Sequence, residues 1–327
     1  MKFLVFGALN IDLVFSVDHI VLPGETIGSV SLMKSAGGKG ANQAAALAKA
    51  GLPVYMAGKI GRDGEFLLEL LRSYGVNTSK VAVYEGATGQ ALIQLDRNKQ
   101  NAIVLYGGGN SAITLEEIHN TIDAFSAGDL IVLQNEIVHV REIMEYAKKR
   151  GLRICLNPSP CNEKIKDLSL DIADMLFVNE IEAASLADMP PDTDIPRVLE
   201  KLVKRFPHAE IILTAGKDGA WYGFEGTRGK GEIVDLPVAD TTGAGDTFTG
   251  YFIAAREKNM SVNDALAIAC KASSIAVSRK GAMESIPLAD EVVEWQNHAE
   301  RHGLPHTAYH DPDYVKCDCC TNIRNLV

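Results

Sequence analysis

The sequence predicts an α/β fold: a central, mostly parallel sheet flanked by helices on both faces, with a small β-sheet lid. Short apolar runs alternate with helical segments along most of the chain, which is typical of a parallel sheet. Several of these runs end in polar residues, as strands do beside a ligand crevice. Two groups of strand-like segments break the rhythm because no helix separates them, and they indicate a second, smaller sheet.

Composition and charge narrow the class of protein. The 327 residues, 46% of them hydrophobic, suffice for one large globular domain with a small appendage. The net charge of -10 and the lack of a Lys/Arg run argue against a nucleic-acid partner. Asn10 and Asp12 interrupt the N-terminal apolar run far short of a membrane span or signal peptide. We therefore expect a cytoplasmic protein with reduced cysteines and no membrane partner.

The N-terminal elements lead to two polar positions and a glycine turn. A buried strand is expected at 2–9, with Asn10 and Asp12 at its carboxyl end. The turn at 37–43 reads Gly-Gly-Lys-Gly-Ala-Asn-Gln and enters an alanine-rich helix that Gly51 closes. The glycines allow backbone conformations that other residues avoid, so the predicted helix can start directly after this turn.

The remaining elements follow the same rhythm, with polar groups after three strands: Asn135 and Glu136, Asn157, and Asn179 to Glu182. Thr114 and Ser261 are helix N-caps by their spacing to acidic residues. Large-sheet strands are expected at 54–60, 130–134, 153–157, 175–179, 210–214, 220–225 and 231–236, with helices at 65–74, 138–150, 180–188, 195–206, 246–258 and 262–279. Small-sheet strands are expected at 13–17, 27–33, 81–84, 90–96 and 102–106.

A second glycine turn carries the strongest chemical signal. Gly243, Ala244 and Gly245 precede Asp246 at the start of a helix, where unpaired N–H groups and the helix dipole favour an anion. A phosphate or developing oxyanion beside a carboxylate base suggests phosphoryl transfer. The alternative is an ordinary glycine turn with an aspartate near a helix start.

These motifs occur together in one order: Asn10 to Asp12, Gly37 to Gln43, Asn179 to Glu182, Thr214 to Gly216, and Asp240 to Phe248. On them, the chain resembles the PfkB-type sugar kinases, the ribokinase family, over roughly residues 3–290. The resemblance implies a ribokinase-like fold and ATP-dependent phosphorylation of the terminal hydroxymethyl group of a pentose, foremost D-ribose to D-ribose 5-phosphate. The alternatives are a kinase of the same family for a nucleoside or another sugar, and a non-catalytic sugar-binding regulator.

The resemblance also implies roles for individual residues. Asp246 matches the general base, and the N–H groups that follow Gly243, those of Ala244, Gly245 and Asp246, match an anion hole. The sugar-binding positions that match are Asn10, Asp12, Gly38, Lys39, Asn42 and Glu136. The nucleotide-binding positions are Asn179, Thr214, Gly216, Gly219 and Gly245. Glu182 matches the position that organises Mg²⁺ through water, and a monovalent-cation site, with K⁺ as activator, is implied at Asp240, Thr242, Ala276, Arg279, Gly281 and Ser285.

The domain organisation follows from the same resemblance. A kinase domain is expected at 1–295, with lid strands from about 12–36 and 81–108, and pairing of two lids in a homodimer is implied. A tail at 296–327 lies outside the resemblance. Its His298 and His302, one helical turn apart, and its Cys317, Cys319 and Cys320 suit a metal ion; the alternative is an exposed helix end followed by an unstructured tail.

Overall fold

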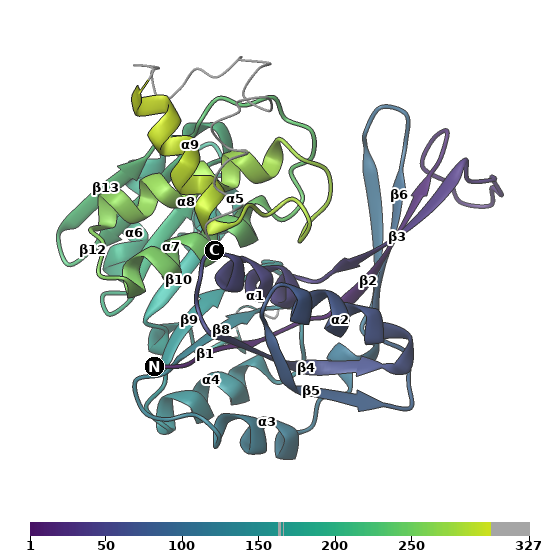
Figure 1. The fold of residues 1–327 in the computed structure, drawn as a ribbon, viewed down its shortest axis with the longest axis horizontal. Helices are drawn as coiled ribbons and strands as arrows, with labels where there is room; N and C mark the ends of the chain where they lie inside the picture. Colours follow the sequence, from purple (N-terminus) through teal and green to yellow (C-terminus); the bar gives the residue numbers. More distant parts are fainter. Residues whose placement is uncertain (163–164, 166, 302–327) are drawn as a thin grey trace, which may run out of the picture.

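β1 (Phe3–Phe6) shows why the large sheet is covered on both faces. Its side chains alternate, so that Phe3 and Val5 join one hydrophobic core and Leu4 and Phe6 join the other, and all four are buried. The computed structural model describes residues 1–162, 165 and 167–301 (Figure 1). The predicted fold class, with a mostly parallel sheet between two helical layers, is confirmed.

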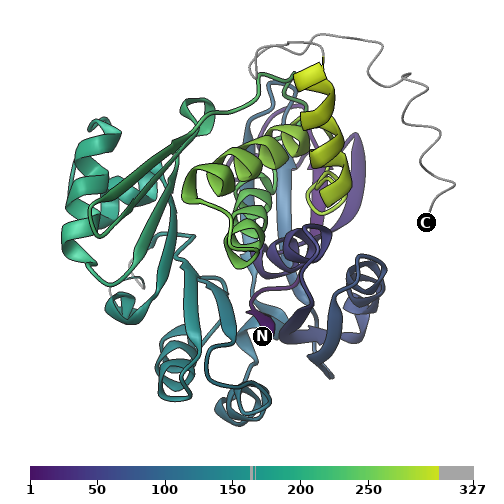
Figure 2. The same cartoon turned by 60° about the vertical axis from the view of Figure 1, so that its left-hand side comes forward.

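The two helical layers lie on opposite sides of the sheet (Figures 1 and 2). The first contains α1 (Lys39–Lys49), α2 (Glu65–Ser73), α7 (Ala244–Glu257), α8 (Val262–Val277) and α9 (Ala289–Arg301). The second contains α3 (Leu115–Ile122), α4 (Val140–Lys149), α5 (Glu180–Leu186) and α6 (Ile195–Arg205). Short 3₁₀ helices are η1 (Arg62–Gly64), η2 (Gly108–Ser111), η4 (Leu170–Ile172) and η5 (Gly216–Asp218).

The large sheet has nine strands in the order β13-β12-β11-β10-β9-β8-β1-β4-β5. Besides β1 they are β4 (Val54–Gly61), β5 (Asn77–Tyr84), β8 (Leu130–Gln134), β9 (Arg153–Asn157), β10 (Met175–Asn179), β11 (Glu210–Thr214), β12 (Ala220–Phe224) and β13 (Thr227–Gly231). The antiparallel pairs are β11 with β12 and β12 with β13, and the other neighbours are parallel. The chain runs outward from β1 to β4 and β5, then returns to β8 on the other side of β1. The strand order therefore reverses between β1 and β8, where ligands bind in such sheets.

The small sheet stands away from the layered body (Figure 1). Its order is β3-β2-β6-β7, formed by β2 (Asn10–Ser16), β3 (Ser31–Gly37), β6 (Gly89–Leu95) and β7 (Asn101–Tyr106). β2 and β6 are parallel, and the other two pairs are antiparallel. Because β2 follows β1 directly, the root of this sheet lies at the switch point.

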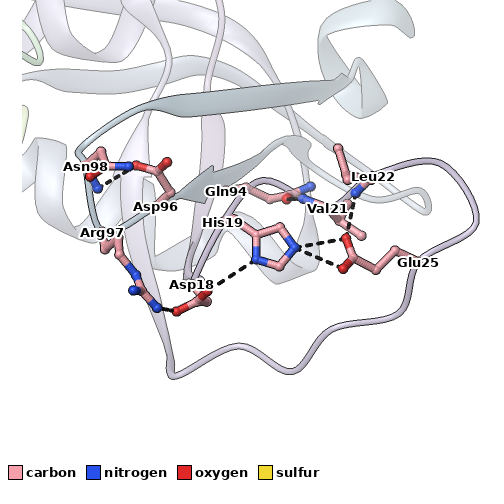
Figure 3. Close-up of polar contacts among 9 residues, drawn as sticks. All are labelled: Asp18, His19, Val21, Leu22, Glu25, Gln94, Asp96, Arg97 and Asn98. Atoms are coloured by element: carbon pink, nitrogen blue, oxygen red, sulfur yellow. Dashed lines mark hydrogen bonds and ion pairs between the residues drawn. The ribbon is translucent and has the colours of Figure 1, made fainter.

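Side-chain contacts hold the far end of the small sheet together (Figure 3). The His19 ring lies between two carboxylates, with Nε2 3.0 Å from Glu25 Oε1 and Nδ1 3.3 Å from Asp18 Oδ2. Arg97 pairs with Asp18 from the β6–β7 turn. The backbone N–H of Val21 donates to Gln94 Oε1 at 2.9 Å. These contacts tie the loop after β2 to the end of β6.

Three strand predictions were wrong. The segment 81–84 belongs to β5, which pairs parallel with β4 in the large sheet, because the chain returns to that sheet directly after α2. The strand predicted at 27–33 begins at Ser31. The strand predicted at 231–236 is β13, which ends at Gly231: Glu225 and Gly226 both have positive φ and form a tight hairpin turn that starts β13 early.

The two predicted helix N-caps are confirmed. Thr114 forms a capping box with Glu117, and the Ser261 side chain accepts the Asp264 N–H. Among the described residues, the helices are all too short or too polar to cross a bilayer. The predicted metal ligands His302, Cys317, Cys319 and Cys320, and the side chain of His298, lie outside the described part.

Candidate active site

Small residues let helix α1 start directly against β1. The Ala41 N–H donates to Ala8 O at 3.0 Å. Gly38 has φ +93°, and a Cβ there would lie 2.6 Å from Ala8 O. A Cβ at Gly40 would lie 2.5 Å from the Gly7 carbonyl carbon. The glycine turn therefore brings Lys39, Asn42 and the N-terminus of α1 to the carboxyl end of β1.

Asp246 lies in the first turn of α7 and is only 7% exposed. Its Oδ2 accepts a hydrogen bond from Asn42 Nδ2 at 3.0 Å, and its Oδ1 accepts one from Gln43 Nε2 at 2.9 Å. Helices α1 and α7 approach closely because Gly250 faces Ala46: a Cβ on Gly250 would lie only 2.4 Å from the Cβ of Ala46. Two helices that are distant in sequence thus place amide donors on one buried carboxylate.

The turn before Asp246 leaves backbone donors open. Gly243 has φ +74° and precedes the first helical residue, Ala244. The Ala244 N–H donates to Thr241 O at 3.3 Å, whereas those of Gly245 and Asp246 have no acceptor within the described part of the chain. A Cβ on Gly245 would meet no atom within 4 Å, so space lies beside these donors. The arrangement suits an anion.

Lys39 is the cation among these carboxylates. The Asp246 carboxylate is the main cause that raises the pKa of Lys39, against burial, and Glu136 and Glu182 act in the same direction. Glu136 Oε2 accepts the Lys39 backbone N–H at 2.9 Å. Burial raises the pKa of Glu136, although Lys39 opposes the rise. These carboxylates keep the Lys39 ammonium group charged.

Asn10 and Asp12 lie on β2 at the root of the small sheet. Asn10 Oδ1 accepts from Asn110 Nδ2 at 2.7 Å, and Asn110 Oδ1 accepts the Leu9 N–H at 3.1 Å. Burial is the main cause that raises the pKa of Asp12 to about 7, and the charges of Glu136 and Glu284 add to it. A Cβ at Gly37 would lie 2.1 Å from Asp12 Oδ2, so this glycine makes room for the carboxylate.

Asn179 and Glu182 form a capping box at the start of α5. Asn179 Oδ1 accepts the Glu182 N–H at 2.8 Å, and Glu182 Oε2 accepts the Asn179 N–H at 3.1 Å. Asn179 pairs with Thr214 at the carboxyl end of the neighbouring strand. After Thr214, the Ala215 N–H donates to Gly219 O at 2.8 Å and closes a loop in which Gly216 and Gly219 have positive φ. A Cβ on Gly216 would meet open space.

The residues of the expected cation site surround the loop before α7. Asp240 accepts from the N–H and hydroxyl of Thr242 and, through its other oxygen, from the Gly281 N–H. Although burial acts the other way, these bonds lower the pKa of Asp240. Arg279 pairs with Glu291 and donates its N–H to Ala276 O at 3.0 Å. The Ser285 hydroxyl donates to Ala282 O at 2.7 Å.

Three buried amides beside the site were missed at the level of sequence. Gln43 and Gln134 are 0% exposed, and Asn110 is 3% exposed. Gln43 lies in the predicted glycine turn, and Gln134 precedes the predicted Asn135 and Glu136. For Gln43 and Gln134 the available signal is an amide next to an apolar run, because a buried amide needs partners; Asn110, in a glycine-rich loop, has no such signal.

Known proteins share both the sequence and the fold. A family model described as pfkB family carbohydrate kinase matches residues 1–289. The ribokinase of Staphylococcus aureus is 34% identical over 301 residues, covering 89% of this chain and 98% of the relative. The deoxyribokinase of Salmonella typhi is 31% identical over 305 residues, covering 90% and 98%. The Arabidopsis thaliana ribokinase, solved with ribose and ATP, has a TM-score of 0.80 and 30% identity, covering 90% and 97%.

These matches extend over nearly all of the two described sheets and every motif that forms the site. The chain therefore belongs to the pfkB family of carbohydrate kinases.

Proposed function

We propose that this protein is an ATP-dependent sugar kinase that phosphorylates the terminal hydroxymethyl group of D-ribose and forms D-ribose 5-phosphate. The observation that carries the proposal is the buried Asp246 carboxylate in the first turn of α7, beside two backbone N–H groups without acceptors in the described part. A base and an anion site at one helix N-terminus are what transfer to a hydroxyl group requires. The relatives named ribokinase support ribose as the acceptor.

In this proposal Asp246 takes the proton from the attacking hydroxyl group. The free N–H groups of Gly245 and Asp246 stabilise the charge on the transferring phosphoryl group, and Lys39 adds a positive charge. Phosphoryl transfer passes through a loose transition state, so holding the hydroxyl in line is the larger contribution.

The sugar is held from two sides. Asn10 and Asp12 approach from β2, and Gly38, Lys39, Asn42 and Glu136 approach from the α1 side. Asn42 Oδ1 is buried without a hydrogen-bond partner among the described residues, which supports an acceptor role toward a ligand hydroxyl. Two carboxylates and two amides favour a ligand with several vicinal hydroxyl groups over an apolar base.

The nucleotide is proposed to lie along the carboxyl ends of β10 and β11, at Asn179, Thr214, Gly216 and Gly219. Glu182 fits Mg²⁺ held through water, because the capping box occupies only Oε2 and leaves Oε1 available. When bound, Mg²⁺ would neutralise charge on the ATP phosphates.

The loop around Asp240 is proposed to bind K⁺, with Thr242, Ala276, Arg279, Gly281 and Ser285. Its carboxylate, hydroxyl and carbonyl oxygens are the ligands that a hard cation prefers. A Cβ on Gly243 would lie 3.4 Å from Ala282 Cα, so the cation loop runs close to the anion site, and the cation would order that site without taking part in bond changes.

The central experiment compares Asp246→Asn with the unchanged protein. ATP consumption with D-ribose is expected to fall about 1000-fold or more, while ribose binding by calorimetry stays within a few-fold, because the amide keeps the shape but cannot accept the proton. Phosphorylation that persists at a substantial rate would refute Asp246 as base. A panel of ribose, 2-deoxyribose and nucleosides, each with and without K⁺, identifies the acceptor and the cation requirement; turnover only with nucleosides would refute the sugar assignment.

Two further properties belong to the proposal. A homodimer is proposed to form through the small sheet, where large apolar side chains such as Val104 are exposed (64%). A cytoplasmic location is proposed from the three described free cysteines and the acidic composition.

A further inference from the structure

Behind Asp246 lies a chain of buried amides that the proposed mechanism has not used. Gln134 Nε2 donates to Gln43 Oε1 at 2.6 Å, and Gln43 Nε2 donates to Asp246 Oδ1 at 2.9 Å. Gln134 is the last residue of β8, Gln43 belongs to α1 and Asp246 belongs to α7. Both glutamines are 0% exposed. The chain therefore joins three elements without a route through solvent.

The direction of this chain is fixed at one end. An ionised carboxylate only accepts hydrogen bonds, so Gln43 must turn its NH₂ group toward Asp246. Its carbonyl oxygen then faces Gln134, which must donate. The Asp246 charge thus determines the orientation of both amides.

Gln134 is accommodated by a glycine, Gly7, and it leaves one buried oxygen without a hydrogen bond. A Cβ on Gly7 would lie 2.0 Å from Gln134 Oε1, and this oxygen is buried without a partner among the described residues. A leucine would fill such a position more favourably, because a buried unpaired polar atom is destabilising. A polar side chain kept here points to a role other than packing.

The two amides on Asp246 differ. Asn42 Oδ1 has no partner in the described part and is the amide proposed to meet the sugar, whereas both ends of the Gln43 amide are engaged within the protein. Gln43 therefore holds Oδ1 from within the protein, and Oδ2, which accepts from Asn42, is the oxygen on the side of the proposed sugar contact.

We propose that Gln43 is a positioning residue that holds the Asp246 carboxylate so that Oδ2 accepts the proton, and that Gln134 keeps the Gln43 amide in the required orientation. In the step, the hydroxyl proton passes to Oδ2 as its oxygen bonds to the γ-phosphorus. The bond from that phosphorus to the β–γ bridging oxygen breaks, and its electron pair leaves with ADP. This inference rests on Asp246 being the base.

The first test replaces Gln43 by Met, which has a similar length but no donor. The kcat for ribose is expected to fall roughly 10- to 100-fold with KM within about threefold, because a hydrogen bond to a charged group is lost at the base and not at the sugar. Gln100→Met, at an exposed glutamine of the β6–β7 turn, is the matched control and is expected to leave both constants unchanged.

The second test uses Gln134 and distinguishes orientation from simple packing. A carboxylate in Gln134→Glu attracts the Gln43 NH₂ group and turns the Gln43 carbonyl toward Asp246, so kcat is expected to fall further than in Gln134→Met, although Glu is closer to Gln in shape. In the Gln43→Met background this difference should vanish, because no amide remains to turn.

The outcomes separate the two assignments. If Asp246→Asn abolishes turnover while Gln43→Met keeps kcat within twofold, the positioning role is wrong and the base assignment stands. If Asp246→Asn stays active, the proposed base itself fails. Thermal melting monitors folding; should Gln43→Met not fold, the comparison of Gln134→Glu with Gln134→Met decides, and equal kcat values for these two would overturn the inference.

Discussion

Asp12 is a buried carboxylate at the proposed sugar site, and its pKa lies near neutral pH. Burial and the charges of Glu136 and Glu284 raise its pKa to about 7. In the proposed sugar site, the ionised form would accept hydrogen bonds from two sugar hydroxyl groups, whereas the protonated form would have to donate one of its own. Sugar binding should therefore favour the ionised form.

We expect the KM for ribose to rise as the pH falls from 8 to 6, by up to about tenfold per pH unit below the pKa, while kcat changes less. Asp12→Asn should raise KM at pH 8 and remove this dependence, because no proton remains to bind. Initial rates across that range measure both effects. An unchanged pH slope in the variant would assign the dependence to another group.

The same residue links function to stability. Between about pH 4 and 7 the folded protein keeps a proton on Asp12 that the unfolded chain has lost, so the contribution of this residue to stability falls as the pH rises through that window. We expect Asp12→Asn to raise the free energy of unfolding at pH 8 by roughly 1–2 kcal/mol and to change it little at pH 4. Urea unfolding at both pH values provides the measurement, and lower stability at pH 8 would contradict the argument.

Sequence patterns predicted the charged residues and glycines of the site, but not the buried amides that hold them in place. Asp246, Lys39 and Asn42 stand in recognisable turns. Gln43 and Gln134 do not, because their role depends on α1, α7 and β8 meeting in space. The resemblance pointed to Asn179 and Glu182, yet only the structure shows that the two form a capping box, which occupies one oxygen of the expected magnesium residue.

Helix α1 carries residues of the proposed site at its first end and is anchored to another segment of the chain at its last. Its first five residues include Lys39, Asn42 and Gln43, and its last residue, Lys49, is buried. Lys49 Nζ donates to Met283 O at 2.8 Å and to Ile286 O at 2.9 Å, and it lies over the Tyr74 ring. Burial lowers the pKa of Lys49, against the charges of Glu291 and Glu284. One ammonium group thus fastens the segment that follows Gly281 to α1.

Lys49→Met should destabilise the protein by about 2–4 kcal/mol, because two buried carbonyl groups lose their charged donor. Lys258→Met is the matched control: Lys258 is exposed and donates to a single carbonyl, Ala50 O, at 3.0 Å, so its loss should cost less than about 0.5 kcal/mol. Urea unfolding midpoints compare the two. Equal losses in the free energy of unfolding would show that the buried hydrogen bonds of Lys49 contribute no more than the exposed one of Lys258.

Helix starts were more predictable than strand pairing. Caps such as Thr114 and Ser261 act within one turn of chain, so local spacing reveals them. The partner of a strand depends on residues far away: 81–84 has the pattern of its neighbours in the small sheet but pairs with β4. The second kind of error concerns strand limits: because Glu225 and Gly226 form a two-residue turn, β13 begins at Thr227, four residues before the predicted start.

For the whole molecule, β7 is the strand through which we propose that two copies assemble. Four consecutive apolar side chains on it, Ile103 to Tyr106, are each more than half exposed (52%, 64%, 59% and 54%). They alternate between faces, and Leu105 shares the face of Ala91 and Asp12 through the strand register. β7 is also an edge of its sheet, with backbone groups open to pairing. A lone monomer would leave both an edge and apolar area in water.

We expect a dimer at micromolar concentration by light scattering, formed through one face of β7. Two matched double variants identify that face: Ile103→Lys with Leu105→Lys charges the side of Asp12, and Val104→Lys with Tyr106→Lys charges the opposite side. The double variant on the face that forms the interface should be monomeric, because its two lysines would lose their hydration there without gaining an oppositely charged partner. If the Asp12 side is the interface, ribose KM should rise together with dissociation, since Asp12 on that face is proposed to bind the sugar. A monomeric unchanged protein, or two double variants that both remain dimeric, would rule out assembly through β7.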